Sequence, residues 1–176
     1  MLGGSSNINY LLYVRGDAKD FDHWADLGFH EWSYEKVLPY FLKSEKYLDQ
    51  DLNDEINHNT HGELPVRDSI YLSPLAKAWQ KMAEKHHLNQ SDINDGDLKG
   101  FAVPQLNLDS QGRRGDTYSS FLKHILHTRK NLQVVTGARV YRVLLDDEKV
   151  TRGNLIPGMT HENDFSLLFL IILPRC

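Results

Sequence analysis

The stretch of sequence that decides the fold reads LGGSSNINYLLYVRG and occupies residues 2–16. Gly3 and Gly4 carry no Cβ, so this loop can adopt positive φ and let a ligand approach its backbone closely. Residues 8–14 form an apolar run that is compatible with a helix or a strand, because periodicity alone does not separate the two. On composition alone, the stretch is a glycine–serine loop in front of a buried element.

Composition places the chain among globular proteins of about one domain. Its 176 residues are 40% hydrophobic and 25% charged, which are ordinary values, and its 8 Tyr, 7 Phe and 3 Trp argue against disorder. The 20 Lys and Arg residues and 24 Asp and Glu residues give a net charge of -4. A protein that binds the phosphate backbone needs a clustered positive surface. We therefore expect no nucleic-acid partner and interpret short basic pairs such as Arg113-Arg114 as a solvated face.

Cysteine usage and hydropathy exclude further classes. The one cysteine is Cys176, so the chain has neither an intramolecular disulfide nor a CxxC metal site. The longest apolar run lies within residues 165–173 and is shorter than the roughly 18 residues that a membrane span requires, so we expect no membrane partner. The first residues lack the basic and apolar regions of a signal peptide, and the sequence leaves the compartment open.

Helix signals occur at four places along the chain. Asp17 is a suitable N-cap, and Ser73 followed by Pro74 is the clearest helix start. Pro39 is expected to kink its helix or to divide it in two. The expected helices cover residues 17–27, 33–47 and 73–87, and a fourth begins at residue 116 with apolar residues at i, i+3, i+4, i+7 and i+8.

Strand signals are shorter and lie between the helices. Residues 49–62 are acidic and Asn-rich and are expected to form an exposed loop. The expected strands cover residues 64–66, 101–108, 132–136 and 138–145. Residues 167–173 are compatible with a buried strand but have no turn-linked partner. The pattern predicts a fold of the α/β class, or mixed α+β.

The histidines and glycines give no catalytic or metal motif. His58 and His61 lie in the acidic loop, and His124 and His127 fall off the apolar stripe, so we expect solvated or capping side chains. A zinc site needs three or four ligands at suitable spacing, and the chain contains no HExxH and no CxxC. No two glycines are separated by one residue, which excludes GxGxxG, and no GK[ST] occurs.

Five ordered motifs change the interpretation of the first loop. After residues 2–16 the chain reads WSYEKVLPYF at 32–41, HGELPV at 61–66, GRRGDTYSSFL at 112–122 and NLQVVTG at 131–137. In this order they resemble the glucose-methanol-choline (GMC) family of flavin oxidoreductases, nearest to its insect glucose dehydrogenase-like members. The resemblance covers about residues 1–151.

The resemblance implies FAD as the cofactor and assigns residues to it. In the family the GGSS loop lies along the FAD pyrophosphate, and backbone N–H groups with a serine hydroxyl suit a diphosphate. It thereby places Gly4, Ser5 and Asn9 at FAD, with Asn9 and the backbone of Tyr10 and Leu12 near the isoalloxazine. Val140 matches a position whose backbone contacts the adenine in the family. From the missing ligand motifs we expect no metal site.

The resemblance also implies a partial GMC fold, with an incomplete FAD-binding domain and part of a substrate domain that carries an antiparallel sheet. Residues 152–176 read as an atypical tail that is poorly ordered or packs opportunistically. The implied divisions are 1–16 for the FAD signature, 17–130 for helices and substrate domain, 131–151 for strands that return to the FAD domain, and 152–176 for the tail.

The activity implied is oxidation of the CH–OH group of an alcohol or sugar, with hydride transfer to FAD. The family's GxGxxG unit and its catalytic His pair have no match here, so no residue is assigned a catalytic role. We therefore expect an internal fragment that binds FAD weakly or not at all and turns nothing over. The alternative is a truncated, non-catalytic binding or regulatory module of the same origin. Substrate identity, electron acceptor and oligomeric state stay open.

Overall fold

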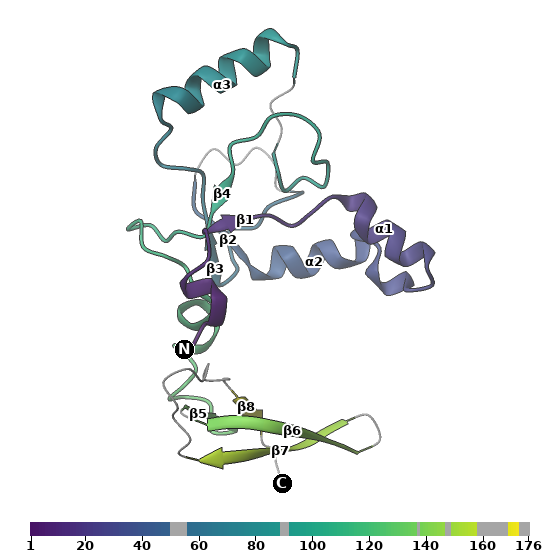
Figure 1. Cartoon of the computed structure of the whole chain (residues 1–176), viewed down its shortest axis with the longest axis vertical. Coiled ribbons are helices and arrows are strands. Elements are labelled where there is room, and N and C mark those ends of the chain that lie inside the picture. The colour runs from purple at the N-terminus through teal and green to yellow at the C-terminus, as the bar shows by residue number, and fades with distance from the viewer. Residues whose placement is uncertain (50–55, 89–91, 137, 147–148, 158–168, 173–176) are drawn as a thin grey trace. The chain divides into compact units, whose positions relative to one another are not determined.

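The computed structural model describes residues 1–49, 56–88, 92–136, 138–146, 149–157 and 169–172 (Figure 1). These residues mix helices with short strands, which confirms the predicted fold class. They divide into two compact units: the first is Met1–Ile8 with Thr117–Cys176, and the second is Asn9–Asp116. In the ranges just given, no helix combines the length and the apolar character needed to cross a bilayer.

In the second unit, α1 (Ala18–Asp26) begins where the sequence predicts it. The side chain of its N-cap, Asp17, accepts a hydrogen bond from Lys19 N over 2.9 Å. Phe21 is the buried residue of this helix, and its ring packs edge-on against that of Phe41 at 5.8 Å. The contact joins α1 to α2.

Helix α2 (Tyr34–Ser44) is shorter than predicted. Pro39 lies inside a single helix and removes one N–H donor without dividing it. The prediction that the helix continues to residue 47 is wrong. Residues Glu45–Tyr47 form strand β2 instead, which pairs in parallel with β3 (Leu64–Val66). This pairing satisfies backbone groups that a longer helix would otherwise use.

Helix α3 (Pro74–Lys85) confirms the clearest prediction. Ser73 Oγ accepts a hydrogen bond from Ala76 N over 3.1 Å, and Pro74 opens the helix. Leu75 and Trp79 on its apolar face are 69% and 53% exposed, whereas Ala83 is buried.

Strand β4 (Gln105–Leu106) is much shorter than the strand predicted over 101–108. It pairs antiparallel with β1 (Leu12–Tyr13). Pro104 precedes β4 and has no N–H to donate to a ladder, which is a physical reason for the late start. The apolar run at 8–14 therefore contributes a short strand.

In the first unit, the predicted helix at residue 116 is wrong as a regular α-helix. The structure places a π-helical turn, η3 (Tyr118–Leu122), in which Lys123 N donates to Tyr118 O over 2.8 Å. The hydrogen bonds that follow span either three or four residues: Ile125 N and Leu126 N both donate to Leu122 O. The apolar spacing is that of a helix, but the backbone winds more widely.

The strands of the first unit form two antiparallel pairs in the described ranges. Strands β5 (Leu132–Val135) and β6 (Ala138–Asp146) confirm the predicted runs on either side of residue 137. β6 pairs with β7 (Lys149–Pro157), and β5 pairs with β8 (Phe169–Ile172). Within the apolar run at 167–173, residues 169–172 thus form a strand whose partner precedes it in the chain.

The core of the second unit contains polar as well as apolar side chains. Tyr47 and Val66 are buried on β2 and β3. Buried polar or charged residues in this unit are Arg15, Glu45, His58, Asn94 and Gln105. Polar and charged residues are seldom fully buried unless they are paired, so these five side chains are candidates for a structural or functional role.

Candidate functional site

The first turn of the chain uses two glycines in the left-handed region. Gly3 has φ 90° and Gly4 has φ 54°, a conformation that costs an L side chain about 1–2 kcal/mol. They lead into the 3₁₀ helix η1 (Gly4–Asn7), where Ser6 N donates to Gly3 O over 3.2 Å. Gly4 and Ser5 are exposed on this turn. In the described ranges the Ser5 hydroxyl has no hydrogen-bond partner.

Ser6, in contrast, is occupied within the first unit. Its Oγ accepts a hydrogen bond from Thr117 N over 3.0 Å and also bonds Gly3 O. Thr117 Oγ1 donates to Gly3 O over 3.2 Å. Ser6 and Thr117 therefore hold the turn in place, which leaves Gly4 and Ser5 as the residues that can meet a ligand.

Asn9 and Tyr10 lie in the second unit, at the start of its chain. Asn9 Oδ1 accepts hydrogen bonds from Leu11 N over 3.1 Å and from Arg114 Nη1 over 2.7 Å. Tyr10 is 88% exposed, and Leu12 on β1 is 44% exposed. Together they offer an uncovered apolar and aromatic surface next to an oriented amide.

Val140 lies on β6, opposite Leu155 of β7. Gly4, Ser5 and Val140 belong to the first unit, whereas Asn9, Tyr10 and Leu12 belong to the second. Their assignment to FAD stays a prediction.

Asn94 holds the backbone of residues 13–15 from the side. Its Oδ1 accepts from Arg15 N over 2.7 Å, and its Nδ2 donates to Tyr13 O over 3.0 Å. Nδ2 also donates to Gln105 Oε1 over 2.7 Å. The side chain is fully buried and every bond it makes is to a suitable partner. The segment after Tyr10 is thus fixed by residues far away in the sequence.

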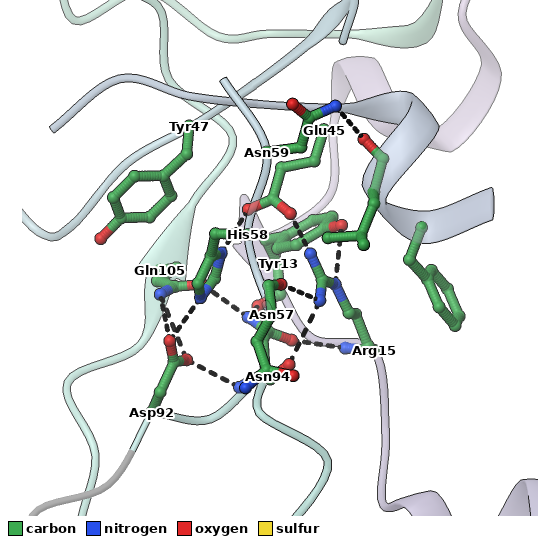
Figure 2. Close-up of polar contacts among 12 residues, drawn as sticks. Tyr13, Arg15, Glu45, Tyr47, Asn57, His58, Asn59, Asp92, Asn94 and Gln105 are labelled. Carbon is green, nitrogen blue, oxygen red and sulfur yellow. Dashed lines mark hydrogen bonds and ion pairs between the residues drawn. The ribbon is translucent and has the colours of Figure 1, made fainter. Parts of the chain in front are cut away.

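Asn94 and Arg15 belong to a group of hydrogen-bonded polar side chains, which we call the polar cluster (Figure 2). Its members are Arg15, Glu45, His58, Asp92, Asn94 and Gln105. The guanidinium of Arg15 forms an ion pair with Glu45 and donates to Asn57 O over 2.6 Å. The side chain of Arg15 is 1% exposed and that of Glu45 is 0% exposed. Neither charge can be solvated by water, so each depends on its protein partners.

His58 lies between two carboxylates. Its Nδ1 is 2.6 Å from Glu45 Oε1, and its Nε2 is 2.5 Å from Asp92 Oδ2. An ionised carboxylate only accepts, so both ring nitrogens must donate, which requires the imidazolium form. The charges then alternate along the chain of contacts from Arg15 through Glu45 and His58 to Asp92.

The pKa values follow from this geometry. Burial alone would lower the pKa of His58, but the hydrogen bonds to Asp92 and Glu45 outweigh it and raise the pKa to about 9. Burial would raise the pKa of Asp92, but the hydrogen bonds from His58 and from the amide of Asn94 outweigh it and lower the pKa. At neutral pH the cluster therefore holds two cations and two anions.

The expectation that His58 is solvated or capping is wrong. Its side chain is 3% exposed, and the ring stacks at a tilt on Tyr47 at 4.8 Å. His61, three residues later, is exposed as predicted. The sequence did not separate the two histidines, because both lie in the acidic stretch 49–62. Neither its composition nor the His58–His61 spacing shows which histidine meets Glu45 and Asp92.

We predict that the stability of the chain falls as pH rises from about 6.5 through about 9. The unfolded pKa of His58 is 6.5 and the folded value is about 9, so its contribution is complete below 6.5 and is lost above 9. The loss is at most about 3.4 kcal/mol. Urea titrations at several pH values measure it.

The test variant is His58→Gln, and its matched control is His61→Gln. The first is expected to remove most of this pH dependence and the second to leave it unchanged, since His61 is exposed. A pH profile of His58→Gln that matches the parent chain would contradict the prediction.

An apolar hollow lies on the second unit between α1 and η2 (His30–Trp32). Trp24, Phe29 and Trp32 line a cavity of about 440 Å³. The rings of Trp24 and Trp32 pack edge to face at 6.0 Å.

Within the ranges that the structure describes, no group of three His, Cys, Asp or Glu side chains is arranged to hold a metal ion.

Comparison with known proteins gives a consistent result. A family model described as GMC oxidoreductase matches residues 1–161, ten residues beyond the end of the resemblance predicted from the motifs at about residue 151. The chain is 36% identical over 148 residues to "Glucose dehydrogenase [FAD, quinone]" of Drosophila melanogaster, which covers 82% of this chain. It is 34% identical over 160 residues to "Oxygen-dependent choline dehydrogenase" of Yersinia pestis, which covers 89% of this chain.

Solved structures agree with the fold. The crystal structure of pyridoxine 4-oxidase from Mesorbium loti superposes with a TM-score of 0.77 at 27% identity, covering 96% of this chain and 31% of that one. The match confirms the predicted partial fold. The chain spans about a quarter of the length of the curated relatives it matches, 23% for the Drosophila protein and 28% for the Yersinia protein.

Proposed function

Because the chain belongs to the GMC oxidoreductase family, we propose that it forms part of the FAD site of an enzyme that oxidises the CH–OH group of an alcohol or sugar. Two relatives are named as dehydrogenases, of glucose and of choline. One of them is named with FAD. Their names support the cofactor and the substrate class.

The observation that carries the proposal is the turn at Gly3–Gly4. Both residues have positive φ, and the turn presents Gly4 and an unpartnered Ser5 hydroxyl. A hydroxyl without a protein partner suits an oxygen of a diphosphate. Gly4 donates its own N–H to Met1 O over 3.2 Å, but it has no Cβ that would keep a ligand away from the backbone. The residues present therefore fit FAD, and we assign Gly4 and Ser5 to its pyrophosphate.

We assign the flavin ring to Asn9, Tyr10 and Leu12, and the adenine to the backbone of Val140. Tyr10 and Leu12 leave a large apolar area uncovered at the start of the second unit, and an aromatic ring system is a suitable cover for it. When bound, FAD accepts hydride from the substrate carbon.

We assign no catalytic residue to this chain. Oxidation of an alcohol needs a general base for the hydroxyl proton. His58 does not suit this role, because its pKa is raised to about 9 and both ring nitrogens already bond carboxylates. The chain's contribution is to bind and orient the cofactor.

A segment exchange tests the proposal. The 148-residue region of Drosophila melanogaster glucose dehydrogenase that aligns with this chain is replaced by the corresponding residues of this chain. We expect this chimera to purify with flavin and to oxidise glucose. A chimera that folds, as judged by its thermal transition, but contains no flavin would contradict the proposal.

For the 176-residue chain alone, we predict no turnover and little or no bound flavin. Tyr10 and Leu12 are exposed among the described residues, and the chain matches only 23% of the length of the Drosophila relative, so we expect contacts to FAD to be missing. Flavin absorbance after purification and a dye-reduction assay with glucose measure both quantities. A stoichiometrically yellow chain would refute this prediction.

A second candidate function is a non-catalytic binding module. Trp79 is 53% exposed and Phe121 is 37% exposed, so both offer apolar surface to a partner protein. Affinity capture with the chain and with Trp79→Ser separates the two candidates. A specific partner lost in that variant, together with a flavin-free chimera, would favour this function over the first.

A further inference from the structure

We propose that Arg114 is a positioning residue that sets the turn over residues 9–11 and fixes the orientation of the Asn9 carboxamide. This inference rests on the proposed function, because it concerns the residue that we place next to the flavin. Arg114 lies 105 residues after Asn9 in the sequence. It acts through Asn9 and is not itself assigned to the cofactor.

The first step concerns the Asn9 side chain. Its Oδ1 accepts from Arg114 Nη1 at 2.7 Å and from Leu11 N at 3.1 Å. A flipped carboxamide would place its own N–H donors against these two donors, so the flip is disfavoured. The exposed Nδ2 has no partner in the described ranges and is left as a donor. An isoalloxazine ring carries carbonyl oxygens and ring nitrogens that accept such a bond.

The second step concerns the backbone at Leu11. Its φ is 68°, an uncommon conformation for a residue other than glycine. The Asn9 oxygen and the Leu11 amide close an Asx-turn, which supports this conformation. Leu11 O accepts from Asn107 N over 2.8 Å on the other side. The strained residue is therefore held from both ends.

The third step concerns how Arg114 is itself held. Leu108 and Arg114 form an isolated antiparallel bridge, and Gly115 N donates to Asn107 O over 2.8 Å. A Cβ on Gly115 would lie 2.3 Å from Pro65 Cγ, so this backbone packs closely on β3. Asn107 and Arg114, which hold Leu11 and Asn9, thus belong to one fixed hairpin.

Amide hydrogen exchange of the full 176-residue chain tests the positioning role. Arg114→Met removes a charge-assisted bond, and we expect the Leu11 amide to exchange about tenfold faster, with the thermal midpoint little changed because Arg114 is half-buried. Arg114→Lys keeps a charged donor and should restore part of the protection. The control is Arg113→Met, whose side chain is 72% exposed and pairs with Asp109.

Two results would overturn the positioning role. One is an unchanged Leu11 amide in Arg114→Met. The other is equal acceleration of amides throughout residues 9–116, which would indicate general destabilisation. Protection that returns in Arg114→Lys and persists in Arg113→Met supports the specific contact.

Asn9→Asp tests the orientation of the amide separately. A carboxylate still accepts from Arg114 and from Leu11 N, so Leu11 protection should persist, but it offers no donor at neutral pH. In the chimera we expect this variant to bind FAD about tenfold more weakly. Undiminished affinity would overturn the orientation. A parent chimera without any flavin would refute the proposed function, while the exchange result for Leu11 would still stand.

Discussion

Glu45→Gln is expected to lower the free energy of unfolding of the chain by about 3–5 kcal/mol, the usual cost of breaking a buried ion pair. Arg15 and His58 each donate to a different oxygen of Glu45. Glutamine has one acceptor oxygen, so one of the two donors must face an NH₂ group. The buried cations lose their shared counter-ion at the same time. Urea unfolding followed by tryptophan fluorescence measures the change.

Glu31→Gln provides the matched control. It breaks the ion pair between Glu31, which is 86% exposed, and Lys36, which is 47% exposed. Such surface pairs contribute about 0.2–1 kcal/mol. Equal effects of Glu45→Gln and Glu31→Gln would show that the polar cluster does not stabilise the fold. If Glu45→Gln does not fold, Glu45→Asp is measured instead. It keeps the charge on a shorter side chain, so its loss of unfolding free energy should be smaller and measurable.

The second large effect is expected at the Gly3–Gly4 turn. In the chimera, Ser5→Ala should weaken FAD binding by about 10–100-fold, since a hydrogen bond to a charged group contributes about 1.5–3 kcal/mol. Gly4→Val should abolish binding at working concentrations, because a β-branched residue is strained at φ 54°. Fluorescence titration of the apoprotein with FAD measures both.

Ser33→Ala is the control for the serine substitution. Ser33 precedes α2 and, like Ser5, forms no side-chain bond in the described ranges, where it makes no cap contact. It lies outside residues 2–16, so its FAD affinity should equal that of the parent chimera. FAD affinity unaffected by both Ser5→Ala and Gly4→Val would place the pyrophosphate elsewhere.

The local elements were predictable where one residue carries a physical signal. Ser73 with Pro74 predicted α3, and Asp17 predicted α1, because capping depends on adjacent backbone groups alone. Leu64–Val66 was predicted as a short edge strand because Pro65 cannot donate to a central ladder. The signature over residues 2–16 indicated the cofactor through resemblance to a family.

The polar cluster was not predictable in the same way. Asn94 meets Arg15 across 79 residues of sequence, and His58 meets Asp92 across 34. These residues lie in loops without periodicity, where no local propensity indicates burial. Likewise, helical spacing at residues 118–126 did not distinguish an α-helix from the π-helical turn, since both place apolar side chains on one face.

The flavin content of the chimera tests the central claim most directly. Purified without added cofactor, the chimera carrying the corresponding residues of this chain should contain close to one FAD per folded molecule, and the Gly4→Val chimera should contain almost none. A chimera that unfolds cooperatively at the temperature of the parent enzyme, yet shows no flavin absorbance, would contradict the assignment of this chain to the FAD site.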